Sequence, residues 1–261
     1  MSIFMNGEEY GPVVLEKDNT TLYALLNGSL TEFENSDVTS LRGRAFANAN
    51  SLITVFLPNV TSFGEFVFFR CYNLKNVYLP ALSSFTTNGQ FQECTSLEKI
   101  MFGQQLPRIS SSMFNGCSAL MNVVLTKTSV TQLQSINAFS ETPFRNGTGG
   151  TVYVPYWITV SGQTVNGVTA YSTATNWSTL KTESTTFKSI QENLVELQTL
   201  DVYGFKLSDY YLIVDELPQT DIATDKIYFI LKTGETNKYE QWFHSSSSWE
   251  QLEDITLGGN S

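Results

Sequence analysis

The sequence has a single histidine and only three cysteines among its 261 residues. Histidine is the side chain that most often serves as a general acid–base or a metal ligand near neutral pH, so its scarcity removes the usual material for both roles. His244 lies next to a run of serines, but no carboxylate, Asp254 included, stands at a spacing that would orient it for a Ser-His-Asp mechanism. We therefore interpret His244 as a solvated loop residue.

Basic residues are also scarce, since 15 lysines and arginines stand against 25 aspartates and glutamates, for a formal net charge of −10. This deficit of positive charge argues against binding to a phosphate backbone, and we expect no nucleic-acid partner. No apolar run approaches the roughly 18 residues of a membrane-spanning helix, which predicts no membrane span. Residues 1–10 lack both basic residues and a long apolar stretch, so we expect no secretory signal.

Other features that could signal chemistry are isolated. Asp215–Glu216 have the composition of a glycosidase carboxylate pair, but they stand just before Pro218 at the end of an expected strand, where solvated charge is ordinary. Asp221 and Asp225 lack the alternating ligands and the glycine of a calcium loop. The glycine-rich turn at 146–150 is not followed by Lys-Ser, as a phosphate-binding loop would be. The sequence thus predicts no catalytic, cofactor-binding or metal site.

What the sequence does contain is internal repetition. Four segments share the pattern Phe-x-x-(Ala or Cys)-x-x-Leu, and the offsets between successive Phe residues are 22, 23 and 23. Each continues as Leu-x-x-(Val or Ile)-x-(Leu or Phe), whose alternation predicts a short strand after one or two helical turns. A period in the twenties predicts a solenoid of stacked coils with parallel strands. The residues predicted to form the repeat core are Phe46, Leu52, Phe68, Cys71, Leu74, Phe91, Cys94, Leu97, Phe114, Cys117 and Leu120.

The three cysteines, Cys71, Cys94 and Cys117, occupy the same position of the repeat. Their spacing fits neither a C-x-x-C pair nor a zinc finger. On neighbouring coils their Cβ vectors would run parallel rather than converge, which disfavours a disulfide. The sequence therefore predicts a stack of small, buried, free thiols.

The fold class predicted from these patterns is a β-rich solenoid with short parallel strands and short helical turns, followed by a small antiparallel β module. An open solenoid end needs a cap, because its last coil otherwise exposes apolar edges. The predicted units are an N-terminal cap or attachment segment (1–29), the solenoid with its C-terminal cap (30–186), a helical connector (187–208), the β module (209–254) and a flexible tail (255–261). The apolar residues of 187–200 recur at helical spacing, and a short oligomerisation helix is the alternative interpretation of that segment.

Details of the array follow from the same patterns. Residues 30–45 have the apolar positions of a first, degenerate coil, and Ala138–Phe139 begin a fifth unit. Residues 158–169 alternate and contain two glycines, which predicts a hairpin insertion. Residues 173–177 are expected to form a short helical cap whose tryptophan, Trp177, packs on the last coil.

The repeat resembles the BspA-like branch of the leucine-rich repeats. The resemblance rests on Ala45–Phe46, the three Phe-x-x-Cys-x-x-Leu units and the Val-x-Leu-Pro strands, and it covers roughly residues 30–190. Residues 151–155 and 171–178 look like the closing strand and closing helix of such arrays. The resemblance implies a binding scaffold and does not by itself specify a function.

Residues 209–254 resemble a small module of bacteriophage virion proteins, especially those of gut phages. The matching segments are residues 211–218, 226–230, 239–243 and 248–250. The resemblance implies a non-enzymatic structural or adhesive protein of a virion, at the tail, baseplate or head surface. Residues expected to form an interface in this module are Tyr210, Tyr228, Trp242 and Trp249.

The expected partners are other virion proteins and a host surface protein or glycan, with a homo-oligomer, for example a trimer, as the assembly. The protein would be made in the host cytoplasm and reside in the virion. The alternative is a bacterial surface adhesin or secreted binding protein built on the same repeat. A third class is a depolymerase acting on host glycans, which would need a pair of carboxylates brought together by the fold.

Overall fold

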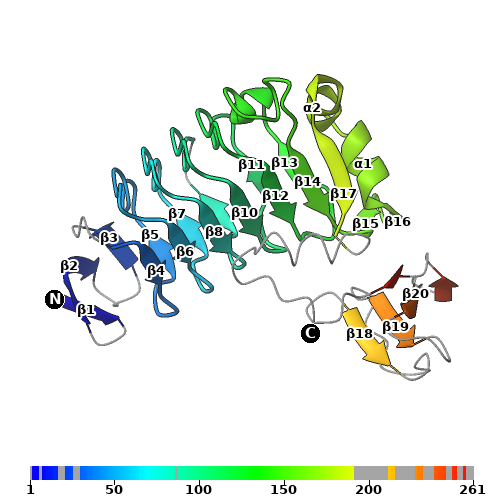
Figure 1. Ribbon diagram of the computed structural model, residues 1–261, viewed down its shortest axis with the longest axis horizontal. Helices are drawn as coiled ribbons and strands as arrows, with labels where there is room; N and C mark the ends of the chain where they lie inside the picture. The colour runs from blue at the N-terminus through cyan, green and yellow to red at the C-terminus, as the bar shows by residue number, and fades with distance from the viewer. Residues whose placement is uncertain are drawn as a thin grey trace.

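The computed structural model describes residues 30–85 and 88–190 in full and, outside these ranges, the backbone of the strands β1–β3 and β18–β22. The described array is a curved stack of coils, each of which adds one strand to a long parallel sheet (Figure 1). Seven strands pair in the order β17-β14-β12-β10-β8-β6-β4. Their bounds are β4 (Glu32–Glu34), β6 (Thr54–Phe56), β8 (Asn76–Leu79), β10 (Lys99–Phe102), β12 (Asn122–Leu125), β14 (Thr151–Val154) and β17 (Thr186–Ser189).

A second line of strands runs along the other side of each coil. The short strands β5 (Ser40–Leu41), β7 (Ser62–Phe63) and β9 (Ser84–Phe85) pair in parallel, and β11 (Arg108–Ile109) pairs likewise with β13 (Gln132–Leu133). The N-terminal strands β1 (Ser2–Met5), β2 (Glu8–Glu16) and β3 (Thr21–Leu25) extend this sheet, since β3 pairs with β5. The strands β1–β3 therefore continue this sheet beyond the first coil.

Between each short strand and the next long strand the chain makes successive single turns. Arg70, Glu93 and Gly116 occupy the same position of this segment and have φ values of 58°, 61° and 79°. A left-handed residue cannot continue a right-handed helix. The amide nitrogens instead donate to the next coil, from Arg70 to Gln92 O (3.0 Å) and from Glu93 to Asn115 O (2.8 Å). The turns are therefore held by neighbouring coils, not by a helix of their own.

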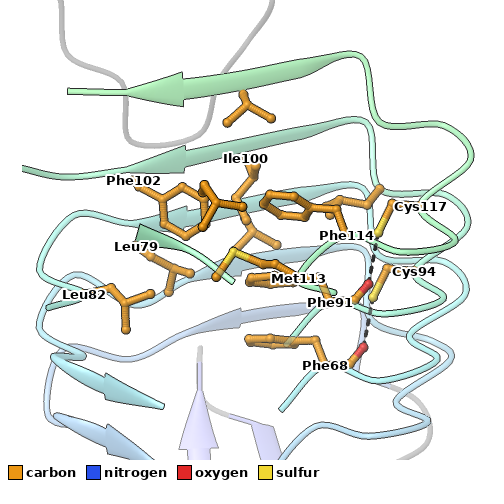
Figure 2. Close-up of a cluster of buried hydrophobic side chains, with 14 of the residues drawn as sticks. Phe68, Leu79, Leu82, Phe91, Cys94, Ile100, Phe102, Met113, Phe114 and Cys117 are labelled. Carbon is orange, nitrogen blue, oxygen red and sulfur yellow. Dashed lines mark hydrogen bonds between the residues drawn. The ribbon is translucent and has the colours of Figure 1, made fainter. Parts of the chain in front are cut away.

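The core lies between the two lines of strands, and all the residues predicted to form it are buried. The phenylalanine rings stack from coil to coil (Figure 2). The ring centroids of Phe68 and Phe91 lie 5.1 Å apart, and those of Phe91 and Phe114 lie 5.8 Å apart. Each coil therefore completes its burial only against its neighbours, as a solenoid requires.

The C-terminal end of the array is closed by a hairpin and two helices. The hairpin of β15 (Trp157–Val160) and β16 (Gln163–Asn166) is antiparallel, as the sequence predicts. The helix α1 (Gly167–Thr173) then begins inside the range predicted for the hairpin, because the Asn166 side chain caps it by accepting from Thr169 N. In α2 (Trp177–Glu183), Trp177 is buried and its Nε1 donates to Thr131 O at 2.7 Å. The predicted packing of Trp177 on the last coil is confirmed. The short helix predicted over residues 173–177 is wrong, because residues 174–176 form the turn between α1 and α2.

The helix predicted over residues 187–200 is wrong at its start. Residues 187–189 belong to β17, which pairs in parallel with β14. Pairing there satisfies the open edge of β14, a long-range requirement that outweighs local helical spacing. The ring centroids of Phe187 and Trp177 lie 5.9 Å apart, so the apolar side chain of Phe187 packs against α2 at the closed end of the array. Residues 191–210 lie outside the described residues.

The C-terminal module is a small sheet. Its order is β18-β19-β20-β21, with β22 also paired to β20. Three of its four pairings are antiparallel, and β18 with β19 is parallel, a pairing that the 12 intervening residues are long enough to connect. The side chains of Tyr210, Tyr228, Trp242 and Trp249 lie outside the described ones. The bounds are β18 (Tyr211–Val214), β19 (Ile227–Leu231), β20 (Lys238–His244), β21 (Trp249–Gln251) and β22 (Ile255–Thr256).

Candidate functional site

The described residues hold no group of three or more His, Cys, Asp or Glu side chains that could bind a metal ion. Nor does any helix in this part of the chain have the length and apolarity to cross a membrane. The glycine-rich segment is an ordinary turn, in which Asn146 Oδ1 accepts from Thr148 N (3.1 Å) and Oγ1 (2.7 Å). Asp215, Glu216, Asp221, Asp225 and Asp254 fall outside the described residues, as does the side chain of His244. The remaining candidate sites among the described residues are the surfaces of the array.

The cysteines form a regular ladder inside the array. Each thiol donates to the backbone carbonyl of a phenylalanine in an earlier coil, and Cys71 Sγ donates to Phe46 O at 3.0 Å. Figure 2 shows the other two hydrogen bonds, from Cys94 Sγ to Phe68 O at 2.9 Å and from Cys117 Sγ to Phe91 O at 3.0 Å. All three are free and buried. The thiols therefore link coils through hydrogen bonds rather than through disulfides.

These thiols are expected to be inert in the folded protein. Burial raises the pKa of Cys94, and a hydrogen bond with the Cys94 thiol, followed by burial, raises the pKa of Cys71. The thiolate is the reactive form, and burial also closes Cys117 to a reagent. A thiol-specific reagent at pH 8 should therefore label none of the three until denaturant is added and then label all of them. Rapid labelling of the native protein would contradict this buried arrangement.

The same shifts predict a loss of stability in alkali. A thiol pKa raised in the folded state means that the unfolded chain releases its protons first. The contribution of these thiols to the free energy of unfolding is complete below the ordinary thiol pKa of about 8.5 and is lost as the pH rises above it. Urea unfolding between pH 7.5 and 9.5 should show this decline, and Cys94→Ala should show a shallower one. Equal slopes for the two proteins would contradict the assignment.

Many polar side chains on the array are engaged between coils. Thr61 Oγ1 donates to Thr39 O (3.2 Å), and Ser83 Oγ donates to Thr61 O (3.1 Å). On the opposite corner Asn73 Nδ2 donates to Asn50 O at 2.6 Å. The Ser, Thr and Asn side chains are therefore partly structural, since these donors bind neighbouring coils.

The outer face of the seven-stranded sheet carries a row of apolar side chains, which we call the outer row. Parallel pairing places its members side by side from β6 to β14. Phe56 is half-buried, but the exposed fractions of the next four fall to 9%, 3%, 0% and 0%. These members are, in order, Phe56, Tyr78, Met101, Val124 and Tyr153. Most of this row is closed to an external partner.

An open surface lies at the edge where the chain enters the long strands, and we call it the rim (Ile53, Tyr72, Lys75, Glu98 and Met121). Backbone hydrogen bonds join Lys75 N to Ile53 O (2.8 Å), Glu98 N to Lys75 O (3.0 Å) and Met121 N to Glu98 O (3.1 Å). Ile53, Tyr72 and Met121 are 37%, 39% and 43% exposed, and Lys75 Nζ lies 3.2 Å from Glu98 Oε1 between them. The rim therefore combines exposed apolar groups with a charged pair.

Sequence analysis missed the rim, although a signal for it was present. Ile53, Lys75, Glu98 and Met121 each directly follow the last leucine of a Phe-x-x-(Ala or Cys)-x-x-Leu unit. The two middle repeats place a charged residue there, which marks the position as exposed, and the outer two place a large apolar residue there. The charged residues at this position of the repeat therefore indicate that the apolar residues at the same position are exposed.

Comparison with known proteins bears on the array. Residues 20–144 match the family described as "BspA type Leucine rich repeat region", in six copies. The crystal structure of the leucine-rich repeat protein of T. pallidum is similar at 26% identity and a TM-score of 0.44, over 56% of this chain and 70% of that chain. No curated protein matches the chain. The family match ends at residue 144, so the resemblance of residues 209–254 to virion proteins stays a prediction. Residues 20–144 of this chain are thus similar to BspA-type leucine-rich repeat regions.

Proposed function

We propose that the protein is a non-enzymatic binding protein whose repeat array presents the rim to a protein partner. The observation that carries this proposal is the concentration of exposed apolar side chains on one edge, since three of the four large exposed hydrophobic residues among the described ones lie there. Tyrosine and methionine are enriched at protein interfaces. From the coil of Ile53 to that of Met121 the rim spans three inter-coil steps, roughly 15 Å at about 4.8 Å each, a suitable size for the centre of a standard interface.

Changing the rim should weaken partner binding without unfolding the protein. Alanine at both Tyr72 and Met121 removes two exposed contacts, for which we expect a loss of about 2 kcal/mol, or roughly thirtyfold in Kd. The partner is first captured from its native source by cross-linking to the full chain, and its affinity for each variant is then measured by calorimetry.

The control is Val160→Ala, because Val160 is also an exposed hydrophobic residue, at 38%, but lies in the hairpin, off the rim. A partner that binds the Val160→Ala protein normally and the rim variant weakly supports the proposal. Equal affinity for the two variants would place the binding surface elsewhere.

We further propose that the protein belongs to a bacteriophage virion. The C-terminal sheet would attach the array to the virion, and the protein would form a homo-oligomer such as a trimer. Support for this comes from the resemblance of residues 209–254 and from the edge of the sheet. Among the described strands β18 ends the sheet, and pairing of such an edge strand with another chain would stabilise it. The array would then project outward toward a host surface protein or glycan.

Removing residues 209–261 should leave a folded array that no longer joins the particle. Circular dichroism of the truncated protein checks folding, and quantitative mass spectrometry of purified particles gives the copy number. If the truncated protein is incorporated at the normal copy number, attachment lies in residues 1–29 or in the array. If the full-length protein is found on the bacterial surface and not in particles, the virion assignment is wrong and the adhesin alternative holds.

A further inference from the structure

Two positions of the turn segments have left-handed backbones, and one of them carries a column of side chains on the surface. Arg44, Phe66 and Gly89 each stand two residues before a repeated phenylalanine and have φ values of 64°, 52° and 72°. Residues at one repeat position lie one above another in a stack of coils. The Phe66 ring lies against Gly89, where a Cβ would come within 2.4 Å of Phe66 Cε1. The glycine therefore makes room for the ring.

The guanidinium of Arg44 lies over this ring and over a second one. Its Cζ is 5.4 Å from the ring centroid of Phe66 and 6.0 Å from that of Phe69. Both rings are half-buried, and Arg44 is exposed. A cation over an aromatic face is attracted by the quadrupole of the ring, and the contact restricts the orientation of the guanidinium. The N–H donors lie in the guanidinium plane, so the ring contact leaves them able to bind an anion.

The next coil contains the same arrangement together with an acidic partner. Arg70 Cζ is 4.7 Å from the ring centroid of Phe69. Arg70 Nε donates to Glu93 Oε2 at 2.8 Å and Arg70 Nη2 donates to Glu93 Oε1 at 3.5 Å, so one carboxylate spans two donors. No carboxylate among the described residues forms an ion pair with Arg44. Arg44 thus repeats the cation–ring half of the Arg70 arrangement, and we call the whole cluster the arginine corner (Arg44, Phe66, Phe69, Arg70 and Glu93).

We propose that Arg44 binds a carboxylate side chain, from aspartate or glutamate, of the protein partner. The guanidinium fork matches the two oxygens of a carboxylate, as the pairing of Arg70 with Glu93 illustrates. This contact would be the second one with the partner of the rim, so its assignment rests on the function proposed above. Arg70 stands two residues before Tyr72 of the rim, and both side chains are exposed. The arginine corner therefore continues the rim, and an interface of standard size is large enough to cover both.

The charges around Arg44 favour a single carboxylate over a polyanion. Glu65 is a neighbour in the next coil, since its backbone oxygen accepts from Arg44 N at 2.9 Å, and Glu93 already compensates the charge of Arg70. The whole chain has a formal net charge of −10. These negative charges would repel a nucleic acid or a polyanionic glycan, whereas one carboxylate needs only one guanidinium. The expected partner is thus a protein that presents an acidic residue beside the apolar side chains that contact the rim.

Nuclear magnetic resonance tests the carboxylate site without the partner. In full-length protein labelled with the heavy nitrogen isotope, Arg44→Lys and Arg70→Lys assign the two Nε–Hε signals by their disappearance. Sodium acetate, added at an ionic strength held constant with sodium chloride, should shift the Arg44 signal and leave the Arg70 signal in place, because Glu93 occupies the Arg70 donors. No shift at Arg44, or equal shifts at both, would overturn the proposal. So would a larger shift at Arg44 with inorganic phosphate, the second probe, than with acetate.

Arg44→Gln tests the same contact in the complex with the captured partner. Lys181→Gln is the matched control, because Lys181 is exposed in α2 at the closed end of the array and its replacement removes the same charge. With native circular dichroism spectra for both, Arg44→Gln should raise Kd roughly fivefold relative to Lys181→Gln, the upper end for an exposed ion pair. High salt should abolish the difference, since it screens exposed charges.

The rim variant separates this contact from the proposed function. If the Tyr72 and Met121 double variant binds weakly while Arg44→Gln and Lys181→Gln have equal Kd values, the contact at Arg44 is overturned and the rim remains the partner surface. Weak binding by Arg44→Gln together with normal binding by the double variant would support the contact at Arg44 and show that the rim assignment is the error.

Discussion

Replacing Phe91 by alanine is expected to lower the free energy of unfolding by about 3–5 kcal/mol, the range for large aromatic side chains in well-packed cores. Phe91 is fully buried at the centre of the array and stacks on Phe68 with the ring planes 4° apart. On its other side it stacks on Phe114, and it also contacts the ring of Phe102 at 6.5 Å. The cavity would therefore open between coils, where the rigid phenylalanine stack resists collapse.

Tyr72→Ala is the matched control, since it removes an aromatic ring of similar size that is 39% exposed. We expect it to cost less than about 1 kcal/mol, in line with surface substitutions away from special features. Urea unfolding monitored by circular dichroism compares the two. Equal losses for Phe91→Ala and Tyr72→Ala would mean that the phenylalanine positions do not form the core.

The core of the array could be predicted from sequence because its contacts repeat. Phe91, Cys94 and Leu97 recur in phase with their counterparts one coil away, so a local pattern already contains the long-range neighbours. The burial of Trp177 was equally predictable. The last coil of a solenoid exposes an apolar end, and a large aromatic residue that follows the last repeat can cover it. In a solenoid, residues that lie one repeat apart in the sequence are neighbours in space.

The features that escaped prediction depend on segments far apart in sequence. Phe187 and the apolar residues after it recur at helical spacing in the sequence, but Phe187 lies in a strand because β17 pairs with the edge of β14. Tyr78 and Met101 occupy outward strand positions, which the alternation rule assigns to solvent, and yet they are buried. The rim lies at a repeat position whose residue differs from coil to coil, so it does not form part of the shared pattern. The repeat pattern therefore predicts the core of the array but not the surface residues that vary between coils.

Gly103→Ala is expected to destabilise the array at the upper end of the roughly 1–3 kcal/mol typical of overpacking. Gly103 follows the strand β10 at the position where the two preceding coils have Pro58 and Pro80. A Cβ at Gly103 would lie 1.7 Å from the carbonyl oxygen of Pro80 and 2.5 Å from its carbonyl carbon. Both are backbone atoms, so no side-chain rotation relieves the clash.

The two coils would have to separate at this point, which would break the hydrogen bond from Gly103 N to Leu79 O (3.3 Å) and loosen the stack beneath it. Because each coil of a solenoid is stabilised by its neighbours, this defect should spread to both sides of the junction. The control is Gln104→Ala at the next, exposed residue, for which we expect little change. Hydrogen exchange should show faster opening of β8 and β10 in Gly103→Ala alone. Protection equal to that of Gln104→Ala would show that the coils do not approach so closely at Pro80.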